Sequence, residues 1–256
     1  MKPNISMARL SAVMTIVSLM SIFGTAKGAV VEGFESGSFN GSESTVGDTG
    51  ITTTYFTIAP TEGTHQMLMT TINNTSDPGV SHQFSDAVPN SSIDSFFSLA
   101  STQPRDGAAV SQEGSAFKIN LGTLTAGTTV TFNYDFLTDE IQPNAHNDFA
   151  YYLLVGSSTV NVLADTNSPL LHATNASNTV FSLETGYQTA TISITTTGTY
   201  TLGLGVSDAV TKDVQSGLLV DNIQVTSPVP EPTTIAFSIA GASLLVALRS
   251  RFKKSS

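Results

Sequence analysis

Hydrophobic and polar residues alternate in several short segments of this chain, with a period of two residues. Apolar side chains occupy every second position in residues 117–121, 130–136, 190–194 and 200–206. This period places one face of a β-strand against a core and the other face toward a polar environment. Residues 149–155 are almost continuously apolar, which is typical of a strand buried inside a core.

Turn-forming residues separate these segments, as at Ala126-Gly127-Thr128 and Thr197-Gly198-Thr199. Residues 73–114 are the least regular part, with long loops or one short helix near Ile93–Leu99. Many short strands without a long helical period favour an all-β fold. We predict an antiparallel two-sheet β-sandwich of the jelly-roll type over residues 29–226.

The N-terminal segment has the order of a secretory signal peptide. Lys2 and Arg9 give a basic start, Leu10–Phe23 is apolar, and Ala26 and Gly28 are small residues suited to a cleavage site. We predict a signal peptide over residues 1–28. The alternative is an uncleaved anchor.

The C-terminal segment is apolar and then basic. Residues 235–248 are uncharged and are predicted to form a transmembrane helix, somewhat short for a hydrocarbon core. The tail over residues 249–256 is predicted to be cytoplasmic, because basic clusters beside a membrane helix stay inside. Its basic residues are Arg249, Arg251, Lys253 and Lys254.

A proline-rich linker, residues 227–234, precedes this helix. Pro230, Glu231 and Pro232 form an extended stretch, because proline fixes its own φ and restricts the residue before it. The order Pro-Glu-Pro, apolar helix and basic tail resembles the PEP-CTERM sorting signal. The resemblance implies that an exosortase, a membrane-embedded transpeptidase, recognises Pro-Glu-Pro and removes the helix and tail. The alternative is an ordinary single-span anchor with a proline-rich stalk.

The N-terminal and C-terminal segments together predict that the protein is exported. The expected partners are the Sec translocon, signal peptidase and an exosortase. The expected location is an inner-membrane intermediate, followed by the cell surface or the extracellular space.

Charge is distributed unevenly along the chain, which carries a formal net charge of -10. All but one of the 20 acidic residues lie within residues 29–228, where Arg105, Lys118 and Lys212 are the basic residues. Such a surface repels nucleic acid and attracts divalent cations, so no nucleic-acid partner is expected. The acidity alternatively serves solubility alone. The chain has no cysteine and therefore no disulfide framework.

Two segments at the ends of the predicted sandwich resemble jelly-roll domains of the carbohydrate-binding-module type. They are Gly33–Gly37, with Glu35, and Leu219–Val225, with Asp221. The resemblance implies that the first and last strands pair and that structural calcium lies between Glu35 and Asp221. The strand pattern also points Asp221 inward with Leu219, where a carboxylate needs a cation or several donors. The alternative is an Asp bonded to backbone amides or water.

A second acidic candidate surrounds the loop between two predicted strands. It contains three acids and an asparagine in the loop, together with one acid on the preceding strand. A second calcium ion or a polar ligand would suit these oxygens, although the spacing is not that of an EF-hand. The alternative is a solvated hairpin loop. The residues are Asp135, Asp139, Glu140, Asn147 and Asp148.

Motifs of common enzymes are absent from the sequence. It has no H-E-x-x-H zinc motif and no G-x-S-x-G nucleophile elbow. We therefore predict a non-catalytic cell-surface or extracellular-matrix protein. One alternative is a lectin-like module that binds exopolysaccharide, with Tyr151 or Tyr152 as a stacking platform. A polysaccharide hydrolase is a further alternative, because acidic pairs occur on any acidic surface.

Overall fold

The computed structural model describes residues 28–75, 80–100, 105–106, 109–140, 147–157, 159–174 and 179–228. Residues Gly28–Ser227 form one compact unit. The predicted transmembrane helix, the basic tail, the Pro-Glu-Pro motif and residues 1–27 of the predicted signal peptide lie outside the described residues. Among those that are described, no helix is long and apolar enough to cross a membrane.

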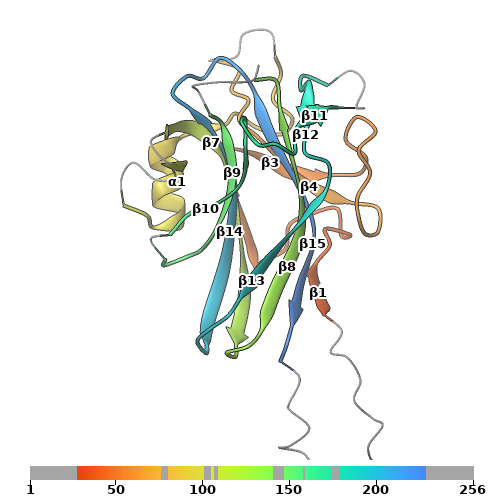
Figure 1. The fold of residues 1–256 in the computed structure, drawn as a ribbon, viewed down its shortest axis with the longest axis vertical. Coiled ribbons are helices and arrows are strands. Elements are labelled where there is room, and N and C mark those ends of the chain that lie inside the picture. The colour runs from red at the N-terminus through yellow and green to blue at the C-terminus, as the bar shows by residue number, and fades with distance from the viewer. Residues whose placement is uncertain are drawn as a thin grey trace, which may run out of the picture. The chain divides into compact units, whose positions relative to one another are not determined.

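Two antiparallel sheets face each other and confirm the predicted all-β sandwich (Figure 1). The first sheet has the order β11-β12-β8-β15-β4-β3, with β1 beside β15 and β13 beside β8. Its strands are β1 (Ala29–Glu32), β3 (Asp48–Thr52), β4 (Gln66–Thr70), β8 (Thr129–Thr138), β11 (His172–Ala173), β12 (Leu183–Glu184), β13 (Gln188–Ser193) and β15 (Ser216–Thr226).

The second sheet has the order β10-β9-β14-β7-β2, with β5 and β6 beside β7. The chain changes sheet repeatedly, from β7 to β8 to β9 and from β13 to β14 to β15, as expected for a jelly-roll type of sandwich. Its strands are β2 (Glu43–Val46), β5 (Val88–Pro89), β6 (Arg105–Asp106), β7 (Ala109–Leu124), β9 (Phe149–Leu154), β10 (Asn161–Asp165) and β14 (Gly198–Ala209).

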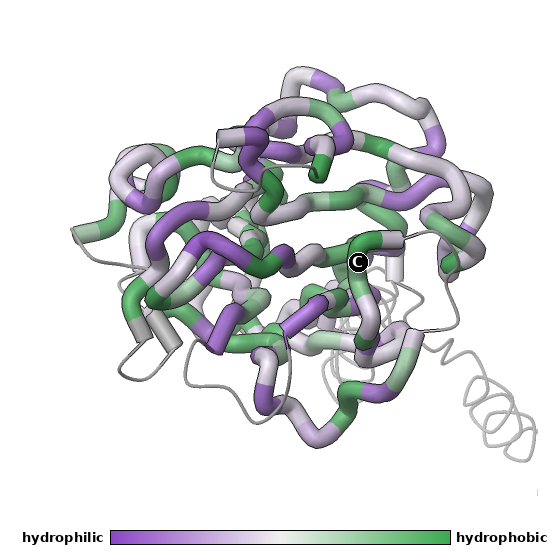
Figure 2. The backbone as a smooth tube through the Cα atoms, turned by 90° about the horizontal axis from the view of Figure 1, so that it is seen from above, coloured by the Kyte–Doolittle hydropathy of each residue, from purple (hydrophilic) through white to green (hydrophobic). Residues whose placement is uncertain are grey.

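The main core lies between the sheets and follows the predicted alternation. Val130, Phe132, Tyr134 and Phe136 of β8 all enter it, and Phe132 contacts Tyr152 of β9 edge to face. Hydrophobic and hydrophilic residues accordingly succeed one another along the strands in Figure 2. Burial of these side chains is the main stabilising term, at about 25 cal/mol per Å² of apolar surface.

Strand β9 is buried on both faces, as its continuous apolar run predicts. Phe149, Tyr151 and Leu153 lie on the outer side of the second sheet, under helix α1 (Asn90–Phe97). The helix falls inside the segment that the sequence marks as irregular, and it packs Phe97 against Tyr151. Figure 1 shows α1 on the outside of this sheet.

The outer side of the first sheet is also covered. Leu68, Leu137 and Leu219 pack there against Tyr55 and Phe181, which come from loops. Leu219 thus faces outward, while Leu218 and Val220 enter the main core.

This arrangement changes the predicted orientation of Asp221. Asp221 is fully buried, but it shares the outer face with Leu219 rather than the main core. The register of β15 then shifts between Asp221 and Gln224, and Asn222 adopts a φ of 55°. This bulge returns Ile223 to the main core, so strict alternation cannot be read across it.

The first and last strands pair, as the resemblance to carbohydrate-binding-module jelly rolls implies. Ala29 of β1 lies opposite Val225 of β15 in an antiparallel register. The start of β1 and the end of β15, and with them Gly28 and Ser227, therefore lie at the same end of the sandwich. Figure 1 shows these two strand ends side by side. We call the opposite end, where β8 and β14 end and β9 and β15 begin, the distal end.

Candidate functional site

Asp221 holds a loop over the outer face of the first sheet. Its Oδ2 accepts hydrogen bonds from the backbone N–H groups of Thr61 and Glu62, at 2.7 Å and 2.8 Å, and from the Thr61 hydroxyl. Its Oδ1 accepts the N–H of Asn222 at 2.7 Å. Four donors fill the usual acceptor capacity of a carboxylate.

Glu35 holds the next part of the same loop. Its two carboxylate oxygens accept the N–H groups of Thr64 and His65 at 2.9 Å, and the Thr64 hydroxyl donates to Oε2. These hydrogen bonds lower the pKa of Glu35, with the His65 N–H as the largest cause. The structure therefore brings Glu35 and Asp221 to one loop, residues 61–65.

The hydrogen bonds to Glu35 and Asp221 use the same oxygens that the predicted calcium ion would need. Every donor on Glu35 and Asp221 is an N–H or O–H group, so their oxygens serve the loop in this arrangement. No three acidic or histidine side chains of the described residues converge as a ready metal cluster. Calcium between Glu35 and Asp221 stays a prediction that these contacts do not support.

A second set of acids lies at the distal end and contains Asp148. Asp148 precedes β9; its Oδ1 accepts the N–H of Ala209 at 2.9 Å, and its Oδ2 accepts the hydroxyl of Ser216 at 2.8 Å. Burial raises the pKa of Asp148 to about 7, against these lowering bonds. Asp148 therefore ties the start of β9 to the end of β14 and the start of β15.

Asp208 of β14 lies beside Asp148 and is fully buried. Thr71 and Asp148 are close enough to influence its pKa, yet no donor meets either oxygen of Asp208 in hydrogen-bond geometry. Burial, followed by the charge of Asp148, raises the pKa of Asp208 well above its ordinary value. A buried carboxyl without donors is costly, because it loses its solvation without replacement.

Two glutamates complete the surroundings of this pair. Glu140 is buried, and its charge contributes to raising the pKa of Asp148. Glu113 lies opposite Asp208 in the register of β7 and β14, and Lys212 pairs with it at 2.7 Å.

The predicted second acidic candidate is thus only partly assembled. Glu140 and Asp148 come together, whereas Asp135 faces the other side of the first sheet and accepts the Thr185 hydroxyl at 3.1 Å. Burial and the nearby charge of Glu184 raise the pKa of Asp135 to about 7. The Oε1 atom of Glu184 in turn lies 3.8 Å from Nε2 of His172.

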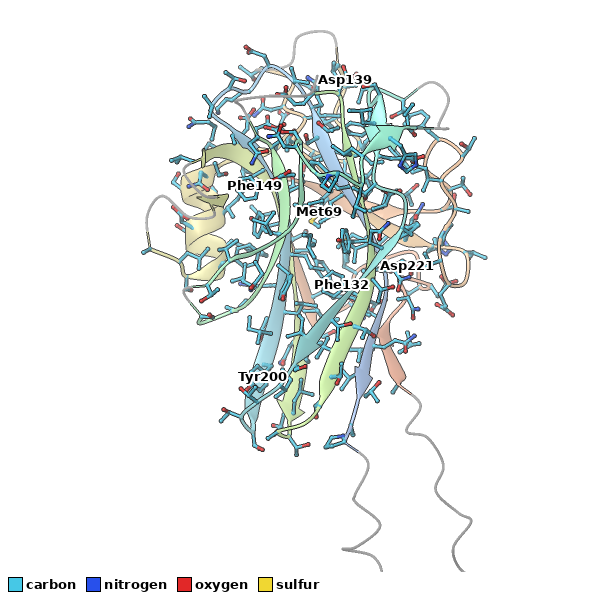
Figure 3. All side chains as sticks on the ribbon, in the orientation of Figure 1. Met69, Phe132, Asp139, Phe149, Tyr200 and Asp221 are labelled. Carbon is cyan, nitrogen blue, oxygen red and sulfur yellow. The ribbon has the colours of Figure 1, made fainter. Side chains whose placement is uncertain are left out.

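Asp139 and Asn147, the other two predicted residues, have separate positions. Asp139 is half-buried at the distal end, where its N–H bonds to the carbonyl of Gln215, and Figure 3 shows it far from Asp221. Asn147 bonds to Asp165 and Asn167 in the turn after β10. Asp208 was missed from the sequence because it stands more than 50 residues from Asp148, and only sheet pairing joins them.

The two tyrosines predicted as sugar platforms are covered to different degrees. Tyr151 is fully buried under α1, and Tyr152 is partly buried against the main core. Phe84, which the sequence did not single out, is 43% exposed. Asp48 accepts the N–H groups of Gln83, Phe84 and Ser85, and so fixes the loop that carries this ring.

Comparison with solved structures finds resemblances to β-sandwich domains at low similarity. The K1 cleaved adhesin domain of Lys-gingipain from Porphyromonas gingivalis W83 is 12% identical, with 80% of this chain and 100% of that chain covered and a TM-score of 0.40. A TmCBM61 module in complex with beta-1,4-galactotriose is 9% identical, with 77% of this chain and 94% of that chain covered and a TM-score of 0.36.

A CBM22-1 xylan-binding domain from Paenibacillus barcinonensis is 10% identical, with 80% of this chain and 100% of that chain covered and a TM-score of 0.34. TM-scores this low carry no argument about this chain. No protein-family model matches the sequence. No curated protein matches it either.

Proposed function

We propose that this chain is an exported, non-catalytic protein whose β-sandwich is displayed at the cell surface or in the extracellular matrix. One observation carries the proposal. The compact unit runs from Gly28 to Ser227, so the sandwich occupies the interval between the predicted signal peptide and the predicted sorting segment. In this proposal the two end segments direct export and sorting, and the β-sandwich is the part of the protein that remains at the surface or in the matrix.

The positions of the chain ends suit display from one point of attachment. Gly28 and Ser227 lie at the same end of the sandwich because β1 and β15 pair. Attachment through the C-terminal segment leaves the loops of the distal end farthest from the attachment point. Loops on a rigid scaffold are the usual carriers of binding functions.

Processing at the Pro-Glu-Pro segment is the testable part of this proposal. The full chain is expressed in a host that contains an exosortase, beside a variant with Pro230, Glu231 and Pro232 changed to Ala. Pro228→Ala is the matched control, because it removes a proline of the same linker outside the motif. We expect the wild type and the control to lose residues 235–256, and the triple variant to keep them and stay in the membrane fraction. An intact C-terminus in all three proteins would overturn the processing proposal.

Recognition of exopolysaccharide is the second candidate function, and Phe84 favours it. Exposed aromatic rings are the surfaces on which sugar rings stack, and rigid side chains lose little entropy on binding. Phe84 lies against Gly50 of β3, and Asp48 fixes its backbone. The ring is therefore both exposed and held in place.

A binding assay with the host's own exopolysaccharide tests this second candidate. We expect Phe84→Ala to weaken binding about 10-fold, in line with the ~1–1.5 kcal/mol that a well-placed aromatic contact supplies. Val210→Ala is the control, because Val210 is an exposed apolar residue elsewhere on the sandwich. Equal binding by wild type and Phe84→Ala, or no binding by the wild type, would reject Phe84 as a sugar platform.

A further inference from the structure

The acidic side chains buried in this sandwich differ in how their charge is balanced. Asp48 and Asp221 each accept several backbone N–H groups, and Glu113 pairs with Lys212. Among the buried carboxyl groups of the described residues, Asp208 is the one whose two oxygens both lack a hydrogen-bond partner. No donor among the described residues therefore offsets a negative charge on Asp208.

Lys118 and Lys212, two basic side chains of the described region, already have partners. Lys212 bonds to Glu113, and Lys118 donates to the carbonyl of Phe96 and lies over its ring. Asp208 also lies beside Asp148, whose own oxygens accept the Ala209 N–H and the Ser216 hydroxyl. Two buried carboxyl groups side by side repel each other when both are ionised. A small cation between the two carboxylates offsets their repulsion. It also replaces the solvation that they lose on burial.

We propose that Asp148 and Asp208 bind a divalent metal ion of the calcium type at the distal end of the sandwich. The carboxylate oxygens of the pair and the nearby Ser216 hydroxyl are oxygen ligands, which hard cations prefer. The hydroxyl of Ser216 lies against Asp148, and the carboxylate of Glu140 is close enough to act on the Asp148 charge.

The ligand set indicates a weak site. Two carboxylates fall short of a cluster of three acidic or histidine side chains, which the described residues do not form anywhere. Water and backbone carbonyls must supply the remaining ligands, since calcium takes six to eight oxygens. Extracellular calcium modules with few charged ligands bind with dissociation constants of about 10⁻⁴–10⁻³ M. Such an affinity suits a protein outside the cell.

This site is distinct from the predicted one at Glu35 and Asp221, and it does not depend on the sorting proposal. Glu35 and Asp221 have donors on all their oxygens, whereas Asp208 has none. If calcium binds at Asp148 and Asp208, changing Asp208 weakens binding and changing Asp221 does not. If calcium binds at Glu35 and Asp221, the reverse holds.

The experiment uses the full chain, purified in detergent and freed of metal with a chelator that is then removed. Calcium chloride is titrated at pH 8, with binding measured by calorimetry and the unfolding midpoint by intrinsic fluorescence. We expect calcium to raise the midpoint of the wild type and of Asp221→Asn, relative to each protein without calcium. We expect Asp208→Asn and Asp148→Asn to bind about 10-fold more weakly or worse, since even outer partners of a metal site are worth that much.

Two results would overturn the inference. The first is a wild type with no calcium response, in which case a shared proton balances the pair. Asp208→Asn would then be more stable than the wild type at pH 8 without calcium. The second is a calcium response that persists in Asp208→Asn but disappears in Asp221→Asn, which places the ion at the other site.

Discussion

At the scale of single residues, Asp48 and Asp221 are buried carboxyl groups that act as acceptors for the backbone of loops. Asp221 shows the pattern most fully, because its four donors come from a loop 160 residues away and from its own strand. Hydrogen bonds to a charged acceptor contribute more than neutral ones, about 1.5–3 kcal/mol each. Asp221 should therefore be worth far more to stability than an exposed acid.

Replacing Asp221 with Asn tests that expectation. All four neighbours of its oxygens are donors, so the new NH₂ group must face a donor in either orientation of the amide. We expect a loss of about 2–3 kcal/mol in the free energy of unfolding, measured by urea denaturation. Asp213→Asn, at an exposed position, should change stability by no more than about 0.5 kcal/mol. Equal stability of the two variants would contradict the role given to Asp221.

Asp135 should make stability depend on pH. Burial raises its pKa to about 7 in the folded protein, from about 3.9 in the unfolded chain. The folded state then binds the proton more tightly, so this contribution is fully present below pH 4 and is lost as the pH rises to 7. Denaturation between pH 4 and pH 8 should show a steeper loss of stability for wild type than for Asp135→Asn. The same slope in both proteins would contradict the assignment.

At the scale of elements, the alternation of hydrophobic residues predicts the strands well. Residues 130–136 form β8 with the expected inward face, and residues 149–155 contain the doubly buried β9. What the pattern does not show is which elements cover the outer faces. Alternation cannot register the bulge at Asn222, which reverses the facing of β15, and it cannot pair Asp148 with Asp208 across two strands. These features arise from sheet pairing, which a local pattern does not record.

Helix α1 offers a test of the second covered face. Phe97 is fully buried and contacts Tyr151, and a Cβ added at Gly203 of β14 would lie 2.6 Å from the Phe97 ring. The glycine therefore makes room for the helix. Phe97→Ala should cost about 3–5 kcal/mol in thermal or urea unfolding. Ser91→Ala, on the exposed side of the same helix, should be nearly neutral. A small effect of Phe97→Ala would mean that the helix is not part of the core.

At the scale of the whole molecule, residues Gly28–Ser227 form one compact unit. In the sequence, the predicted signal peptide precedes this unit and the predicted sorting segment follows it. The unit has its own core between two sheets and additional clusters on both outer faces. Such a unit is large enough to fold without disulfides, which the cysteine-free sequence does not provide.

A fragment of residues 28–227 should therefore fold alone. We expect a far-ultraviolet circular dichroism spectrum of β type and one cooperative thermal transition, as single domains usually show. The fragment should remain in solution without detergent, because the apolar segments at both ends are removed. A broad, non-cooperative transition would show that the sandwich needs residues beyond these limits.

The most direct test of the central proposal, an exported and processed surface sandwich, is the intact mass of the protein isolated from its own host. We predict a single polypeptide that begins at or near Ala29 and ends within the Pro230–Pro232 segment, with any attached group added to that C-terminus. A mass corresponding to residues 1–256, with both apolar segments retained, would contradict it.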